Sequence, residues 1–144
     1  MATKGTLSSE LFNKRVSGFT DVNVVEQVGY NLVTLIESGK LQSEEIHGLL
    51  KEYLQPMINA NIDYLVLGCS HYPYLVPQIQ KILPEHVTII DSGEAVAKQT
   101  KKVLAADNLL NTGTKTTHRF FTNAEPTVLQ NILGNDYLAE YKEF

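Results

Sequence analysis

The residues best suited to chemistry stand together in residues 68–73, which read GCSHYP. Cys69 is the chain's only cysteine, and His71 follows it two positions later. A free thiol is a weak base at neutral pH, but a neighbouring histidine or the amino end of a helix favours the thiolate, which can remove a proton. The segment therefore indicates acid–base chemistry at Cys69, with His71 close enough to assist.

Plainer roles fit the same residues. A lone cysteine in an α/β protein is more often a small buried apolar residue, and His71 would then be an ordinary surface side chain. A zinc site needs about four suitable ligands, and only Cys69 and His71 lie here, so we expect no metal site. Ser70 is not part of a G-x-S-x-G sequence, and no second cysteine offers a redox pair. A Cys–His hydrolase stays open without further support.

The hydrophobic pattern predicts the elements that hold this segment. Residues 62–67 form a short, mostly apolar run that is typical of a strand buried on both faces of a parallel sheet. Residues 43–59, with Ser43 as a cap, and residues 73–83 show helical spacing, and residues 87–90 read as a second strand. Strand, helix and strand imply a parallel crossover, which puts the chemistry at the carboxyl edge of a sheet, where a helix start could direct N–H groups at an anion.

The rest of the chain predicts a further group of elements. Residues 93–105 indicate a helix that Asp91 or Ser92 could cap. Residues 107–117 are rich in Asn, Thr and Gly and predict a loop. The fold class predicted from the alternating elements, which end with a strand at 118–122 and a helix at 126–133, is α/β.

Composition limits the partners and the setting. A chain of 144 residues, 43% hydrophobic and 19% charged, is typical of one compact domain. The net charge of -4, with lysines dispersed, gives no basic surface for nucleic acid. No apolar run approaches the roughly 18 residues that span a bilayer, and the start lacks the apolar core of a signal peptide. We therefore expect neither nucleic acid nor membrane as a partner, and a cytoplasmic location.

Three segments carry a resemblance to a known family. LGCSHYP at residues 67–73 resembles the G-C-[TS]-H-[YF]-P segment around the second catalytic cysteine of the cofactor-independent glutamate racemases. ATKGT at residues 2–6, with Ser9 and Phe12, is similar to the family's A-T-x-G-T-x-x-S-x-x-Y. LVTLIESG at residues 32–39 is similar to its L-V-P-L-V-E-E-G. The matches keep the family's order, so the chain resembles the carboxyl-terminal half of a glutamate racemase.

The resemblance implies roles for individual residues. Cys69 would take the α-proton from one enantiomer of glutamate as a thiolate and, in the other direction, donate a proton as a thiol, with His71 assisting. Thr3, Thr6 and Ser70 would donate hydroxyl hydrogen bonds to the substrate's carboxylates, together with backbone N–H groups. A turn or helix cap is the alternative role for each hydroxyl. No cofactor is implied.

Glu37 aligns with an acidic residue of the family's active-site region and has two interpretations. It either tunes His71 or the substrate ammonium group as a third catalytic residue, or it is a surface charge near the end of a helix. The approach to it departs from the family, because VGYN at residues 28–31 replaces a stretch with a small residue and Cys-Pro. Ser70 stands where threonine is commoner but keeps the hydroxyl.

The resemblance also implies a two-lobe, pseudo-symmetric racemase fold with the substrate between the lobes. Residues 1–92 would form the second lobe, a three-layer lobe with a parallel sheet that carries Cys69. Residues 93–144 would be a return segment that completes the first lobe, most of which lies outside the chain. That lobe would supply the opposite cysteine. Inversion of an α-carbon needs a base on one face and an acid on the other, so we expect this truncated half to be inactive alone.

Other assemblies and substrates stay open at this point. The chain could be a non-catalytic carboxylate-binding module, a fragment that needs a separate amino-terminal lobe, or a homodimer that presents Cys69 twice across a two-fold axis. Aspartate is an alternative substrate, because the hydroxyl set does not separate it from glutamate, although residues 2–6 and 32–39 favour glutamate. The family supplies D-glutamate for peptidoglycan, so the expected role is in cell wall biogenesis and cell shape.

Overall fold

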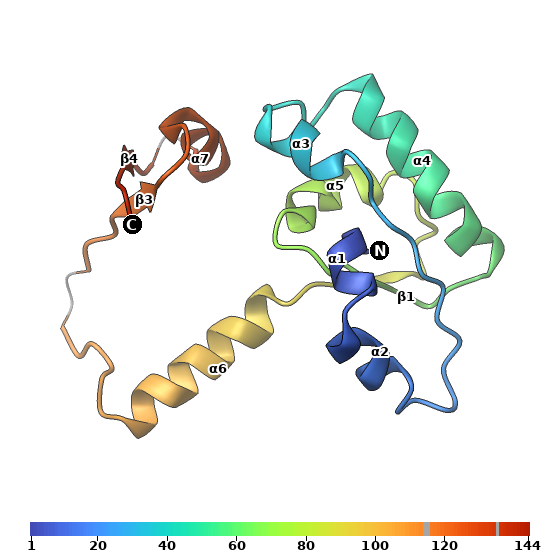
Figure 1. Ribbon diagram of the computed structural model, residues 1–144, viewed down its shortest axis with the longest axis horizontal. Coiled ribbons are helices and arrows are strands. Elements are labelled where there is room, and N and C mark those ends of the chain that lie inside the picture. Colours follow the sequence, from blue (N-terminus) through green and yellow to red (C-terminus); the bar gives the residue numbers. More distant parts are fainter. Residues whose placement is uncertain (114–115, 135) are drawn as a thin grey trace.

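The computed structural model describes residues 1–113, 116–134 and 136–144. A main body of helices packed on short strands is followed by a long helix and a small unit at the carboxyl end (Figure 1). In chain order the elements are α1 Lys4–Leu7, α2 Glu10–Val16, α3 Leu32–Glu37, α4 Glu44–Asn59, β1 Tyr64–Val66, the 3-10 helix η1 Tyr72–Leu75, α5 Val76–Ile79, β2 Thr88–Ile90, α6 Gly93–Ala106, β3 Phe120–Thr122, α7 Pro126–Leu133 and β4 Ala139–Tyr141.

The main body is built on parallel strand segments. β1 and β2 pair in parallel, which confirms the predicted relation of these two strands. On the other side of β1, Ala2 forms parallel bridges with Gly68 and with Val28. The N–H of Gly68 donates to the carbonyl of Met1 at 2.9 Å, and the N–H of Ala2 donates to Gln27 at 3.0 Å. Four segments therefore run side by side and bring the amino-terminal residues next to the end of β1.

Helices α3 and α4, with η1 and α5, cover one face of this sheet (Figure 1). The chain forms α4 because its apolar residues recur at helical spacing and because Ser43 caps it, with Oγ accepting the N–H of Ile46 at 3.2 Å. The helix predicted at residues 43–59 is therefore confirmed. The large side chains that are fully buried in the core are Tyr72, Leu32, Ile46, Leu50, Leu54, Met57, Leu65, Leu75 and Ile79.

The predicted burial of the first strand on both faces is wrong. β1 alternates, with Leu65 1% exposed between Tyr64 at 62% and Val66 at 56%. The described residues leave the second face of the sheet largely open, because α6, which follows β2, leads away from it (Figure 1). An apolar run of this kind is typical of a strand whose two faces are both covered by helices. In the described residues, helices cover only one face of β1.

The single helix predicted at residues 73–83 is also wrong in detail. The chain forms the 3-10 helix η1 and then the short α5, which ends at Ile79. Proline has no N–H, so Pro77 cannot donate to the carbonyl of Pro73, and the first turn takes the tighter 3-10 form. Leu83 remains buried although it lies beyond the helix, so the apolar spacing predicted burial better than it predicted secondary structure.

The carboxyl-terminal part begins with the predicted helix α6. Ser92 is at its cap position without a side-chain cap bond, and the Oδ1 of Asp91 just before it accepts the N–H of Gly93 at 2.7 Å. None of the side chains of α6 is buried. Residues 107–113 and 116–117 form neither helix nor strand, as predicted, and residues 114–115 of that predicted loop lie outside the described residues.

A small β-α-β unit ends the chain. β3 and β4 pair in parallel and are joined by α7, which matches the predicted helix at residues 126–133. The side chain of Gln130 links α7 to the start of β4. Its amide nitrogen donates to the carbonyl of Tyr137 at 2.7 Å, and its amide oxygen accepts from the N–H of Ala139 at 3.1 Å. β4 has only three residues and no apolar run, and it was not predicted. No helix in the described part of the chain is long and apolar enough to cross a membrane.

Candidate active site around Cys69

The predicted catalytic segment lies in the turn between β1 and η1. Cys69 is partly buried and directly follows Gly68, which pairs with Ala2 at the carboxyl end of the sheet. A Cβ placed on Gly68 would lie 2.8 Å from the Cβ of Ala2, closer than side chains approach. The glycine therefore allows the loop that begins at Thr3 to lie against the backbone that carries Cys69.

Cys69, His71 and Glu37 form a connected row of side chains. The Sγ of Cys69 lies 4.0 Å from Nδ1 of His71, and Nε2 of His71 lies 3.1 Å from Oε1 of Glu37. The side chain of His71 is 28% exposed and that of Glu37 is 48% exposed. Glu37 is the last residue of α3, so residues more than thirty positions apart in the sequence meet here. The row lies at the carboxyl edge of the sheet and is partly exposed to solvent, so a small molecule can reach it.

This row determines which ring nitrogen of His71 accepts a proton. Nε2 faces a carboxylate, so the neutral ring keeps its proton there and donates it to Glu37. Nδ1 then carries the lone pair and faces the thiol of Cys69 and, at 3.3 Å, the Oγ of Ser70. The geometry allows His71 to accept the thiol proton, which leaves a thiolate, and to return it.

The hydroxyls of Thr3 and Thr6 form a second group beside Cys69. Their Oγ1 atoms lie 3.0 Å apart, and Oγ1 of Thr6 donates to the carbonyl of Gly68 at 3.3 Å. Since each hydroxyl has one proton, Thr3 is the donor within the pair when Thr6 donates to Gly68. Thr3 also caps α1 by accepting the N–H of Thr6 at 3.3 Å. The two threonines thus connect the loop that begins at Thr3 to Gly68, the residue that precedes Cys69.

Ser9 has a purely structural set of contacts. Its Oγ accepts the N–H of Phe12 at 3.2 Å, which caps α2, and donates to the carbonyl of Thr6 at 2.8 Å. The structure therefore gives Ser9 the role of a helix cap.

The helix start next to Cys69 is that of the 3-10 helix η1, which begins at Tyr72. The N–H of Tyr72 donates to the carbonyl of Cys69 at 3.2 Å, and the N–H of Tyr74 donates to His71 at 3.2 Å. Pro73 between them has no N–H. These three positions of η1 therefore offer no N–H to an anion, because two of the groups already have acceptors and the third is a proline. The expected backbone donors would have to come from other residues of the turn, and that expectation stays a prediction.

Tyr72 lies directly beneath this turn and is fully buried. Burial, together with the nearby Cys69 and Tyr53, raises the pKa of Tyr72 to about 12. The phenol is therefore neutral at physiological pH, and its hydroxyl donates to the carbonyl of Gly29 at 3.0 Å. Tyr72 acts here as a hydrogen-bond donor to a distant segment of backbone.

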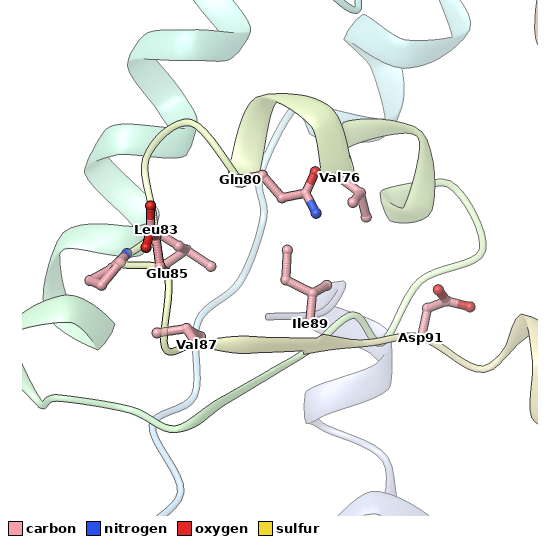
Figure 2. A pocket seen from close by; sticks show the side chains of 8 residues that line it. Val76, Gln80, Leu83, Glu85, Val87, Ile89 and Asp91 are labelled. Carbon is pink, nitrogen blue, oxygen red and sulfur yellow. The ribbon is translucent and has the colours of Figure 1, made fainter.

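A half-open hollow of about 400 Å³ lies on another part of the body. Figure 2 shows Val76 and Gln80, in and just after α5, above Ile89 of β2, with Asp91 at the end of the strand. None of the predicted site residues lines this hollow. Among the described residues, no group of three His, Cys, Asp or Glu side chains is placed to hold a metal ion.

Almost the whole chain matches known proteins. The chain is 44% identical over 134 residues to the glutamate racemase of Pseudomonas putida strain KT2440, and the matched region covers 92% of this chain and 51% of that protein. The chain is a homologue of one half of a glutamate racemase. No protein-family model matches it. The chain spans about half the length of the curated relatives it matches, which is consistent with the predicted carboxyl-terminal half.

Solved glutamate racemase structures share the fold. A glutamate racemase isoform from Bacillus anthracis has a TM-score of 0.81 and 29% identity, over 99% of this chain and 55% of its own. The Francisella tularensis glutamate racemase, solved in complex with D-glutamate, has a TM-score of 0.74 and 26% identity, over 91% of this chain and 51% of its own. The predicted α/β class and the resemblance to glutamate racemases are both confirmed.

The structure brings the predicted residues together in two groups and adds one contact. Ser70 joins Cys69, His71 and Glu37, and Thr3 with Thr6 forms the neighbouring group. The bond between Tyr72 and Gly29 was not predicted, because nothing in the spacing of two residues 43 positions apart pairs them.

Proposed function

We propose that this chain supplies one half of the catalytic site of a cofactor-independent glutamate racemase, with Cys69 as the acid and base on one face of the substrate. The observation that supports this most is the row from Glu37 through His71 to Cys69 at the carboxyl edge of the sheet, with separations of 3.1 and 4.0 Å. Homology to glutamate racemases supports glutamate as the substrate.

The proton transfer follows from the row. The thiolate of Cys69 takes the α-proton, the electron pair of the C–H bond stays on the substrate and delocalises into its carboxylate, and an S–H bond forms. In the reverse direction the thiol gives its proton back to the same face. His71, held by Glu37, exchanges the thiol proton through Nδ1 and resets Cys69 between turnovers.

Three hydroxyls would orient the substrate's carboxylates. Ser70 contacts His71 and lies on the exposed side of the turn. Thr3 can turn its single proton from Thr6 towards a carboxylate without releasing the bond between Thr6 and Gly68. We assign substrate contact mainly to Thr3 and Ser70, and to Thr6 the role of holding the loop beside Cys69.

Inversion requires a second acid or base on the opposite face of the substrate. The curated relatives are about twice as long as this chain, so a second lobe, on the same polypeptide or another, would supply that group. Residues 93–144 would complete that lobe, with residues 1–92 forming the lobe of Cys69. The exposure of Tyr64 and Val66 and the lack of any buried side chain in α6 support such an assembly, in which both would be covered.

The biological role follows from the product. D-glutamate made in the cytoplasm by such an assembly would enter peptidoglycan, so loss of the protein would affect cell wall biogenesis.

Joining the chain to a complementary lobe tests the proposal. Residues 1–144, joined to the amino-terminal lobe of the Pseudomonas putida glutamate racemase, should convert L- to D-glutamate, whereas the 144 residues alone should not, because they lack the second proton donor. Optical rotation of glutamate solutions follows the reaction. Racemisation by the 144 residues alone at a comparable rate, or a joined protein that is folded and binds D-glutamate without racemising it, would contradict the proposal.

A further inference from the structure

We propose that Tyr72 is a positioning residue whose hydroxyl holds Glu37 against His71. The inference rests on the proposed function of the Cys69 site and concerns how this chain aligns it. Tyr72 follows His71 directly in the sequence, and its hydroxyl donates at 3.0 Å to Gly29, which lies eight residues before Glu37. One side chain thus joins the segment of His71 to the segment that leads to Glu37.

The segment at Gly29 is held from several directions. Its N–H donates to the carbonyl of Ala2 at 3.0 Å, so Gly29 is part of the sheet edge, and its carbonyl accepts from Tyr72. A Cβ on Gly29 would collide with the hydroxyl oxygen of Tyr72 and would lie 2.8 Å from Leu32. Only a glycine fits this closely against the tyrosine without a shift of one of its neighbours.

Helix α3 connects Gly29 to Glu37, so the position of Gly29 affects the position of Glu37. Asn31 adopts a left-handed conformation with φ of 61°, which turns the chain into the helix, and its carbonyl accepts the N–H of Leu35 at 3.1 Å. Leu32 and Ile36 anchor the helix in the core. Glu37 is the last residue of this six-residue helix, and its side chain is half exposed, so little besides the direction of α3 keeps its carboxylate at His71.

Tyr53 offers a matched control, because it bonds to the same segment from another helix. Its hydroxyl donates to the carbonyl of Tyr30 at 3.3 Å, next to Gly29, but it comes from α4, which carries no proposed catalytic group. Loss of either hydroxyl removes one tyrosine hydrogen bond to adjacent backbone carbonyls. Only the loss at Tyr72 removes a hydrogen bond that joins the segment of His71 to the segment of Glu37.

The ring nitrogens of His71 report the effect directly. Nitrogen NMR of the 144-residue chain, with His71 assigned by its absence in His71→Gln, should show the neutral ring protonated at Nε2. In Tyr72→Phe the ratio of Nε2–H to Nδ1–H forms should fall roughly tenfold, the size expected for a lost hydrogen bond to a carboxylate. In Tyr53→Phe the ratio should stay as in the unchanged chain.

Two results would overturn the inference. One is a ratio in Tyr72→Phe equal to that of the unchanged chain, and the other is an equal fall in Tyr53→Phe, which would indicate a general loosening. Circular dichroism of both variants checks that they fold. The readout involves no racemisation, so a failure of Cys69 to act as a base would not alter it, and the two proposals fail separately.

Discussion

Replacing Cys69 with serine should lower racemisation by the joined, two-lobe protein by about a thousandfold, the usual contribution of a positioned acid or base. The change exchanges one atom, so the turn and the contact with His71 stay in place. A serine hydroxyl gives up its proton far less readily than a thiol, so it cannot provide the base that removes the α-proton. The chain has no other cysteine that could take over.

Initial rates from L- and from D-glutamate measure this loss in both directions. Ser8→Ala is a suitable control, because Ser8 is exposed and its Oγ donates locally to the carbonyl of Gly5. Its rates should match those of the unchanged protein. A Cys69→Ser protein that keeps a tenth or more of the activity would remove the thiol from the mechanism.

Gly29→Ala should lower the free energy of unfolding of the chain by about 3 kcal/mol, at the upper end of what overpacking costs. The added Cβ would meet the buried ring of Tyr72 at Cζ, 2.9 Å away, as well as its hydroxyl, and Leu32 closes the other side. Neither neighbour can move far, since both are fully buried in the core. Urea denaturation followed by circular dichroism measures the change.

Gly48→Ala is the matched control for that experiment. Gly48 lies inside α4, and a Cβ there meets no atom within 4 Å. Alanine favours a helix interior over glycine, so this variant should gain about 0.5–1 kcal/mol of stability. If the free energy of unfolding of Gly29→Ala lies within about 1 kcal/mol of that of the unchanged chain, the segment can shift to make room for the methyl group. The close fit between Gly29 and Tyr72 would then not set the position of the segment.

The helices α4, α6 and α7 could be predicted because their signals are local. Each has a start that the sequence displays, with Ser43, Asp91 and Pro126 at or next to the first turn. The helix predicted after Cys69 failed for an equally local reason, the two prolines at residues 73 and 77, whose effect on the hydrogen bonds outweighed the apolar spacing.

Burial and pairing depend on parts of the chain that are distant in sequence. Whether a face of β1 is buried depends on which other elements pack on it, and the three residues of the strand do not show that one face stays open. The single-residue bridges of Ala2 to Val28 and Gly68 give no apolar run to recognise. Sequence motifs predicted the residues of the candidate site, but the 3.1 Å contact of Glu37 with His71 arises only from the packing of α3 on the turn.

The central claim is that Cys69 removes the α-proton on one face of glutamate. It is tested most directly by incubating the 144-residue chain with L- or D-glutamate in deuterated water and following the α-proton by NMR. We predict exchange of one enantiomer without racemisation, and its loss in Cys69→Ser. Exchange that persists in Cys69→Ser, or no exchange of either enantiomer by the unchanged chain, would contradict the assignment of Cys69 as a base in this half of the site.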